Sequence, residues 1–319
     1  MLKYGQHIAC WGHTRPVTEV SFVVDGYSAN GETKTLLVSS AHDKHPQVRD
    51  GESGDWIGSF HGHKGAVWSC KVDQRTRTLA ATASGDFSAK LWCATTGKEL
   101  CDIGKHRHVV KTLDFAGDSM QLATGCQDGM VRIFDTARPE AVLRELEVGK
   151  GSEEAVTKMW WKFREENNIL ILGKKNGLIE THDLRVPGAP SAVCIMSVPT
   201  KSAIQDIEVN HRHGVILAAA GKKMYKLDAQ DLSIVQEYDT PKGMTFEAEG
   251  GVSLSPDGKH IMAGASDLDL REFDAKTGEV LRVFKGHHGP IRCVRYHPSG
   301  AMVASGSEDA TIRLWGLAE

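Results

Sequence analysis

The chain has 319 residues, 40% of them apolar, and a formal net charge of −3. This balance is typical of a globular protein and provides no basic field, so we expect no direct nucleic-acid partner. No run approaches the ~18 apolar residues of a membrane span, and the first residues lack the apolar core of an export signal. Seven scattered cysteines indicate a reducing compartment, so we expect the cytoplasm, the nucleus or both.

The chain opens with a strand-like segment, residues 6–11, ahead of a first Gly-His pair, Gly12-His13. From there one pattern recurs: Gly-His, an alternating strand, a turn, a short buried strand, a turn with Asp, and a third strand. Residues 286–315 are its most complete copy. This pattern with a period of ~40–45 residues is typical of WD repeats, each of which forms a four-stranded blade of a β-propeller.

Seven copies follow one another along the chain. The last residue of the third predicted strand is in turn Arg49, Trp92, Phe134, His182, Leu227, Phe273 and Trp315. The sequence therefore predicts an all-β fold, a seven-bladed WD-repeat β-propeller in which residues 1–319 form one domain. The predicted blade cores are residues 12–50, 62–93, 105–135, 151–183, 202–228, 244–274 and 286–316, of which the fourth and fifth rest mainly on spacing.

Two features of the ends and the first blade complete this prediction. Only four residues follow Trp315, so the seventh blade needs a fourth strand from elsewhere, and we expect residues 6–11 to supply it and close the ring. Residues 25–31 are an insertion rich in turn formers, predicted as an exposed hairpin loop.

Several blades carry a set of residues that looks like a hydrolase triad. The sets are His63, Thr82 and Asp86; His106, Thr124 and Asp128; and His287, Ser305 and Asp309. A hydrolase needs one such set with an exposed nucleophile, whereas these recur at constant spacing. In WD-repeat proteins such residues form a buried hydrogen-bond chain that ends on a tryptophan, here Trp92 and Trp315, so we expect a structural role.

No metal or cofactor site is predicted. The pairs His61-x-His63, His106-x-His108 and His211-x-His213 have no further ligands at a known spacing, and a phosphate-binding GxxxxGK[ST] loop is absent from the sequence.

Partner binding is the remaining function, and two surfaces are candidates. In the outer strands Ile57, Leu100 and Leu281 share a phase that we assign to the packed side, which turns Trp56 outward as a possible anchor. The second surface is the propeller face formed by the Gly-His segments and the Asp turns around the central channel. Its candidate residues are Arg15, His42, Lys64, Phe87, Gln127 and His288.

Five segments, GHTRPV at 12–17, GDWIGSFHGHKGAVW at 54–68, KHRHVVKTLDF at 105–115, GCQDGMVRIFD at 125–135 and the stretch 286–309, resemble the serine/threonine kinase receptor-associated protein family, also called unr-interacting proteins. The resemblance implies a non-enzymatic, monomeric adaptor in the cytoplasm and nucleus. Its implied partners are subunits of the survival-of-motor-neuron complex, which serves mRNA splicing, the RNA-binding protein unr, and receptor kinases of transforming-growth-factor-β signalling. The acidic tail that such proteins can carry is not present in this chain.

Two alternatives stay open. The chain also resembles the WD-repeat subunit i of translation initiation factor three, through its GHxGPI and GAVW segments. An enzyme that uses one of the Ser/Thr-His-Asp sets is the other.

Overall fold

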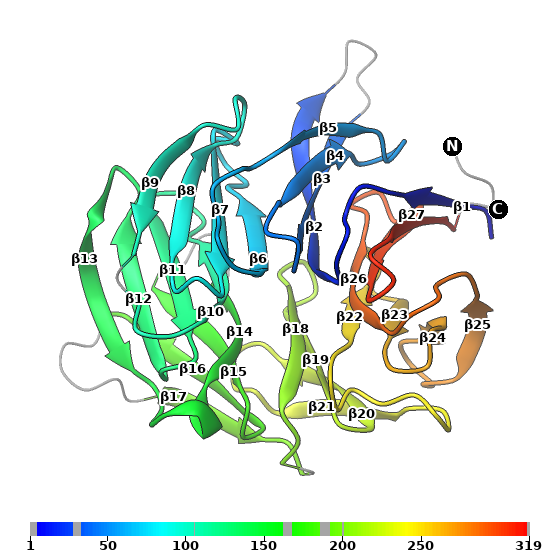
Figure 1. Ribbon diagram of the computed structural model, residues 1–319. Coiled ribbons are helices and arrows are strands. Elements are labelled where there is room, and N and C mark those ends of the chain that lie inside the picture. Colours follow the sequence, from blue (N-terminus) through cyan, green and yellow to red (C-terminus); the bar gives the residue numbers. More distant parts are fainter. Residues whose placement is uncertain are drawn as a thin grey trace.

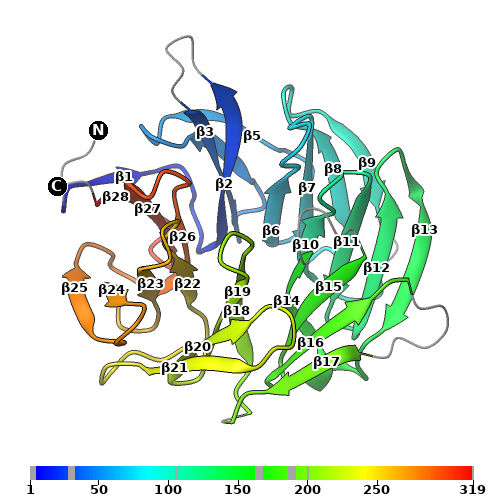
Figure 2. The same ribbon diagram turned by 180° about the vertical axis from the view of Figure 1, so that it is seen from behind.

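The computed structural model describes residues 5–27, 33–104, 106–161, 168–185, 192–199 and 201–317. Its strands form seven four-stranded antiparallel sheets arranged as a ring (Figure 1 and, from behind, Figure 2). The predicted seven-bladed propeller is confirmed.

Blades 1–3 and 7 contain the clearest repeats of the sequence. Their strands are β2 Val17–Tyr27, β3 Thr33–Ala41, β4 Gln47–Asp50 and β5 Trp56–Ser59; β6 Val67–Val72, β7 Leu79–Ser84, β8 Ala89–Cys93 and β9 Glu99–Ile103; β10 Val110–Phe115, β11 Gln121–Cys126, β12 Met130–Asp135 and β13 Arg138–Glu147; and β26 Ile291–Tyr296, β27 Met302–Ser307, β28 Ile312–Gly316 and β1 His7–Cys10.

Blades 4–6 follow the same order, after a short 3-10 helix, η1, at Ser152–Glu154. Their strands are β14 Val156–Trp161, β15 Ile169–Lys174, β16 Leu178–Asp183 and β17 Ala192–Ser197; β18 Ile204–Asn210, β19 Val215–Ala220, β20 Lys223–Asp228 and β21 Ile234–Asp239; and β22 Gly251–Leu254, β23 His260–Gly264, β24 Leu270–Asp274 and β25 Val280–Phe284.

The ring closes through the first strand. β1 pairs antiparallel with β28, from His7 opposite Trp315 to Cys10 opposite Ile312, and so becomes the outer strand of blade 7 (Figure 2). This pairing covers an edge that would otherwise be open, and it confirms the predicted closure.

The insertion in the first blade differs in part from its prediction. β2 continues through residue 27, so residues 25–27 are strand and not loop. Residues 28–31 lie outside the described residues.

The apolar core is a series of interfaces between neighbouring blades. Val23 and Val38 of blade 1, for example, pack with Cys70, Ala80 and Trp92 of blade 2. Alternate residues of each strand supply these contacts, because side chains of a strand point to opposite faces in turn.

The outer strands correct one prediction. Ile57, Leu100 and Leu281 do not face the packed side, since all three are about half exposed. In each case the pairing skips this residue: Arg49 opposes Trp56 while Val48 opposes Gly58, which leaves Ile57 as a β-bulge. A bulge inserts one residue and reverses the phase beyond it, which sequence alternation alone does not reveal.

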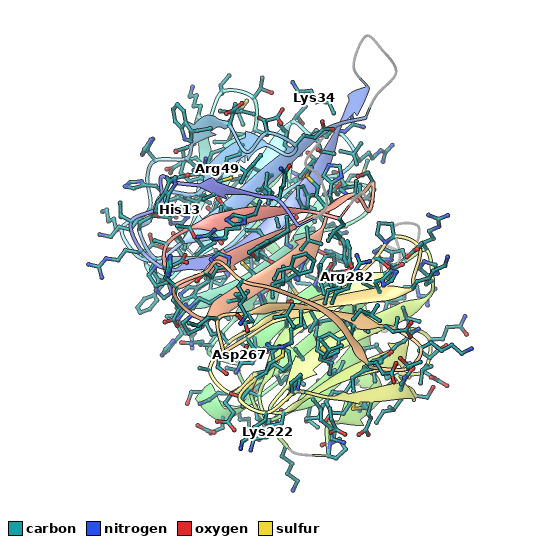
Figure 3. The ribbon with its side chains drawn as sticks, turned by 90° about the vertical axis from the view of Figure 1, so that its right-hand side faces the viewer. His13, Lys34, Arg49, Lys222, Asp267 and Arg282 are labelled. Atoms are coloured by element: carbon teal, nitrogen blue, oxygen red, sulfur yellow. The ribbon has the colours of Figure 1, made fainter. Side chains whose placement is uncertain are left out.

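The two faces of the ring differ in their loops. One end, which we call the histidine face, carries the loops before each innermost strand (β2, β6, β10, β14, β18, β22 and β26) and the turns between the second and third strands of each blade. In the edge-on view of Figure 3, His13 and Asp267 of this face lie toward the left, and Arg282 lies toward the right.

Candidate functional site

The hydrogen-bond chain in blade 7 has the predicted members. Nδ1 of His287 lies 2.9 Å from the Asp309 carboxylate, and its Nε2 lies 2.7 Å from Oγ of Ser305. Since a carboxylate only accepts, Nδ1 donates, and Nε2 of the neutral ring accepts from the hydroxyl. The indole Nε1 of Trp315 donates to the same hydroxyl at 2.8 Å. Burial lowers the pKa of His287, which favours the neutral ring.

Blade 2 repeats this geometry. His63 lies 2.9 Å from Asp86 and 2.6 Å from Thr82, and Trp92 donates to Thr82 at 2.8 Å. Each chain joins the second and third strands of one blade, the turn between them and the loop before the first strand, so it fixes the loop that begins with Gly-His.

Blade 1 contains a third copy that we did not predict. His13 bonds to Asp43 at 2.8 Å and to Ser39 at 2.9 Å. The position of the tryptophan is taken by Arg49, which donates to Oε1 of Gln47 at 2.6 Å. Gly12-His13 and the turn Asp43 are visible in the sequence, and Ser39 lies four residues before Asp43 as Thr82 does before Asp86, so the same spacing indicates this set.

Blade 3 corrects the prediction. His106 bonds to Thr124 at 2.8 Å, but among the described residues no hydrogen bond joins it to Asp128. That carboxylate accepts instead from the Arg132 guanidinium, at 3.2 Å. Arg132 has stronger attraction for the carboxylate than a neutral imidazole, and its presence lowers the pKa of His106, after burial, to about 4.

These sets do not offer a nucleophile. The side chains of Thr82 and Ser305 are 0% exposed, and each hydroxyl is engaged by an imidazole and an indole. A substrate cannot reach them without opening the blade, so the geometry favours the structural role.

The histidine pairs do not form a metal centre in the described part of the chain, where no group of three or more His, Cys, Asp or Glu side chains comes together. His61 lies against His45, with their Nδ1 atoms 3.2 Å apart. His108 packs on Phe87, with ring centroids 5.7 Å apart.

Six predicted partner residues lie on the histidine face. Arg15, Lys64 and His288 are exposed in the loops after each Gly-His, and Phe87 is 46% exposed in its turn. Two are half-buried: Gln127, whose backbone N–H bonds to Val109, and His42, which packs edge-on against Trp68. The structure does not bring these six side chains into one cluster.

The seventh, Trp56, lies at the rim of blade 1. It is 61% exposed and lines a groove of about 380 Å³ together with Trp11, which is 70% exposed. His45, His61 and Gln47 complete much of the groove wall. Trp11 was expected in the strand that closes blade 7, but β1 ends at Cys10, so the exposure of Trp11 in the connection to β2 was not predicted.

The chain is thus a WD-repeat β-propeller, a class of protein that acts as a scaffold for other proteins. The family model "WD domain, G-beta repeat" matches residues 54–93, 97–135 and 278–316. The chain is 36% identical over 308 residues to the serine-threonine kinase receptor-associated protein of Gallus gallus, covering 97% of this chain and 81% of the relative. The protein of that name from Dictyostelium discoideum is 36% identical over 310 residues, 97% of this chain and 98% of the relative.

The chain therefore belongs to the serine-threonine kinase receptor-associated protein family. A second relative is more distant: eukaryotic translation initiation factor 3 subunit I of Caenorhabditis briggsae is 29% identical over 327 residues, 95% of this chain and 94% of the relative. In the described part of the chain no helix has the length and apolar character needed to cross a membrane.

Proposed function

We propose that this protein is a non-enzymatic adaptor that associates with receptor kinases of transforming-growth-factor-β signalling and with the survival-of-motor-neuron complex in spliceosomal ribonucleoprotein assembly. The observation that carries the proposal is 36% identity over 97% of the chain to proteins named for association with serine-threonine kinase receptors. A closed ring supports it physically, because preordered loops lose little conformational entropy when a partner binds.

The test is affinity purification from native extract, with the tagged full chain as bait. We expect receptor kinases, survival-of-motor-neuron complex subunits and unr among the captured proteins, in both cytoplasmic and nuclear fractions. Recovery of none of these classes would reject the proposal.

A second candidate function is that of subunit i of translation initiation factor three, supported by the 29% identity to the nematode protein. Sedimentation separates the two. Cofractionation of the chain with initiation complexes would favour the second function, and cofractionation with the motor-neuron complex the first.

The rim groove offers a specific test of partner binding. We expect Trp56→Ala to lower partner recovery while leaving the melting temperature nearly unchanged, because this exposed indole makes one weak hydrogen bond, 3.2 Å to Ser59. Leu100→Ala, an equally exposed apolar truncation in the next blade, is the matched control. Full recovery with both Trp56→Ala and Trp11→Ala would remove the groove from the candidate sites.

A further inference from the structure

Three innermost strands place a large side chain at the same bulge beside the channel opening on the histidine face. These residues are Trp68 of β6, Lys111 of β10 and Arg292 of β26, each at a register shift after the first strand residue. The Lys111 Nζ lies 2.9 Å from the centroid of the Trp68 ring, and His42 packs edge-on against that ring with centroids 4.6 Å apart. Lys111 is thus held in place by a cation–π contact.

The two cations at this opening differ in their partners. Arg292 has carboxylates on both sides, Glu249 at 3.0 Å and Glu308 at 2.9 Å. Lys111 has no carboxylate within ion-pair distance among the described residues, although it is largely covered by protein. A covered ammonium without a counter-ion is costly unless something supplies one.

The surroundings of Lys111 add to its unbalanced charge. Burial and the nearby Lys158 and Arg292 lower the pKa of Lys111 to about 8, against the attraction of Glu249. Next to it, Nε2 of His42 is buried without a hydrogen-bond partner in the described structure. Among the described residues Lys111 lacks an anionic acceptor, and the neutral His42 can donate from Nε2 to the same anion in its Nε2–H tautomer.

Blades 1–3 extend this charge across the face. Four exposed cations there make no ion pair with a described carboxylate, and with His42 and Lys111 we call them the cationic sector: Arg15, Lys44, Lys64 and Arg107. Of the turn carboxylates of these blades, Asp128 is paired with Arg132, whereas Asp43 and Asp86 hydrogen-bond to His13 and His63 and keep their charge. The five Lys and Arg side chains of the sector outnumber these two carboxylates. The sector is therefore positive in a protein whose net charge is −3.

We propose that the cationic sector binds an acidic segment of a partner protein, with one carboxylate seated on Lys111 and His42 and an apolar side chain packed against Phe87. The proposal rests on the adaptor function and names the chemistry of one partner. The backbone of Phe87 is in the left-handed region, φ 69°, and its ring is 46% exposed, so this turn of blade 2 presents an apolar side chain on the same face as the cations.

A polypeptide fits this sector better than a nucleic acid does. Single-stranded nucleic acids bind on rows of exposed aromatic rings, whereas Phe87 is the one large hydrophobic side chain exposed among the described residues of this sector. Glu249 and Glu308 near this site are both paired with Arg292, so Lys111 is the cation left for a partner carboxylate.

The experiment is fluorescence anisotropy with the full chain and three probes. The first is a labelled short peptide of alternating Asp and Glu with one central Phe, the second is its Asn and Gln counterpart, and the third is single-stranded polyuridylate. We expect saturable, salt-sensitive binding of the acidic peptide alone. Lys111→Met, which preserves the packing on Trp68, is expected to weaken this binding about tenfold because it removes a charge-assisted hydrogen bond.

Lys242→Met is the matched control, since Lys242 is an exposed cation of the histidine face in the loop before blade 6. It should bind the acidic peptide like wild type, and equal melting temperatures would show that both variants are folded. The proposal is overturned if the acidic peptide does not bind, if the two variants weaken binding equally, or if polyuridylate binds more tightly. If the acidic peptide fails while the chain still captures its expected partners from extract, the adaptor function stands and only this inference falls.

Discussion

The carboxylate of Asp309 joins several parts of blade 7 through hydrogen bonds. Its carboxylate accepts from the imidazole of His287, from the backbone N–H of His288, and from both the backbone N–H and the hydroxyl of Thr311, at 2.6–2.9 Å. Burial alone would raise its pKa, but these bonds outweigh burial and lower the pKa to about 2. The carboxylate is therefore ionised and fully engaged near neutral pH.

Asp309→Ala should accordingly lower the free energy of unfolding by about 3 kcal/mol, because a buried imidazole and two backbone N–H groups lose their acceptor. Asp135→Ala is the control, since this carboxylate accepts the backbone N–H of Ala137 in an exposed turn and, among the described residues, contacts no histidine. Urea denaturation measures both. An equal loss in the two variants would mean that the histidine chain adds nothing to stability.

Asp114 of β10 is a buried carboxyl group whose pKa is raised, in contrast to that of Asp309. It accepts the backbone N–H of Trp161 in the next blade at 2.9 Å, but burial raises its pKa to about 6, against the attraction of Lys71 and with some help from Glu19. A carboxyl group whose pKa is higher in the folded state favours folding when protonated. Its contribution therefore falls as pH rises from about 4, the unfolded value, through about 6.

Asp114→Asn keeps the acceptor for Trp161 and removes the charge. We expect it to raise the free energy of unfolding near pH 8 by on the order of 1 kcal/mol, and the melting temperature with it, and to have little effect near pH 4. Thermal melts at the two pH values give the comparison. A variant that is destabilised more at pH 8 than at pH 4 would show instead that the fold favours the ionised form.

Some contacts of single residues could be predicted from the sequence, and others could not. Trp92 and Trp315 were found with their histidines because all members of a set fall at fixed offsets within one repeat. The sequence does not reveal that Asp128 bonds to Arg132 instead of His106. All three residues fit the repeat pattern, and the choice depends on which donor attracts the carboxylate more strongly.

At the level of strands, the blades use two ways to fix the same sheet. Blades 1, 2, 3 and 7 carry the hydroxyl of Ser39, Thr82, Thr124 or Ser305 on their second strand. The residues in register at this position of blades 4–6 are Leu172, Ala218 and Ala263, all 0% exposed within apolar clusters. Blades 4–6 are thus stabilised at this position by apolar packing and not by the histidine hydrogen-bond chain. Their sequences therefore lack the motif but keep the repeat spacing from which they were predicted.

The fourth strands share a feature that the sequence conceals. A register shift leaves one apolar residue bulged in six blades, at Ile57, Leu100, Leu143, Val193, Val235 and Leu281. A bulge interrupts the row of backbone groups that a second sheet would need for pairing. The half-exposed bulge residues thus help to protect the outer edge of each blade from pairing. Simple alternation along the sequence would instead assign these residues to the buried side.

Blade 7 replaces its own fourth strand with β1, and this predicts a measurable weakness. Deleting residues 1–11 should lower the melting temperature of the whole protein, because Cys10 leaves the core and β28 becomes an open edge. A synthetic peptide of residues 5–12 should restore part of the loss, and a scrambled peptide should not. An unchanged melting temperature after the deletion would refute closure by β1.

On the scale of the whole molecule, the ring is held at its centre by charged side chains from different blades. Arg295 of blade 7 forms a two-pronged ion pair with Asp206 of blade 5, at 2.7 and 2.9 Å, and donates to the backbone of Val252 in blade 6 between them. Blades 1 and 2 are joined by Glu19 and Lys71 at 2.9 Å. The sequence does not reveal which of these residues meet, because strand phase fixes the direction of a side chain and not its partner in another blade.

The pair of Arg295 and Asp206 leads to a prediction about how the ring coheres. Arg295→Met should lower the free energy of unfolding by about 3 kcal/mol, because among the described residues it leaves the carboxylate of Asp206, 2% exposed, with only Lys158 at 4.0 Å as a counter-ion. Combining it with Asp206→Asn removes that stranded charge while keeping an acceptor for the Val252 N–H, so the double variant should be more stable than Arg295→Met alone. Urea denaturation of wild type, both single variants and the double variant completes the cycle. If the losses simply add, the two side chains act independently, and the centre of the ring is held by packing between neighbouring blades rather than by charge across the channel.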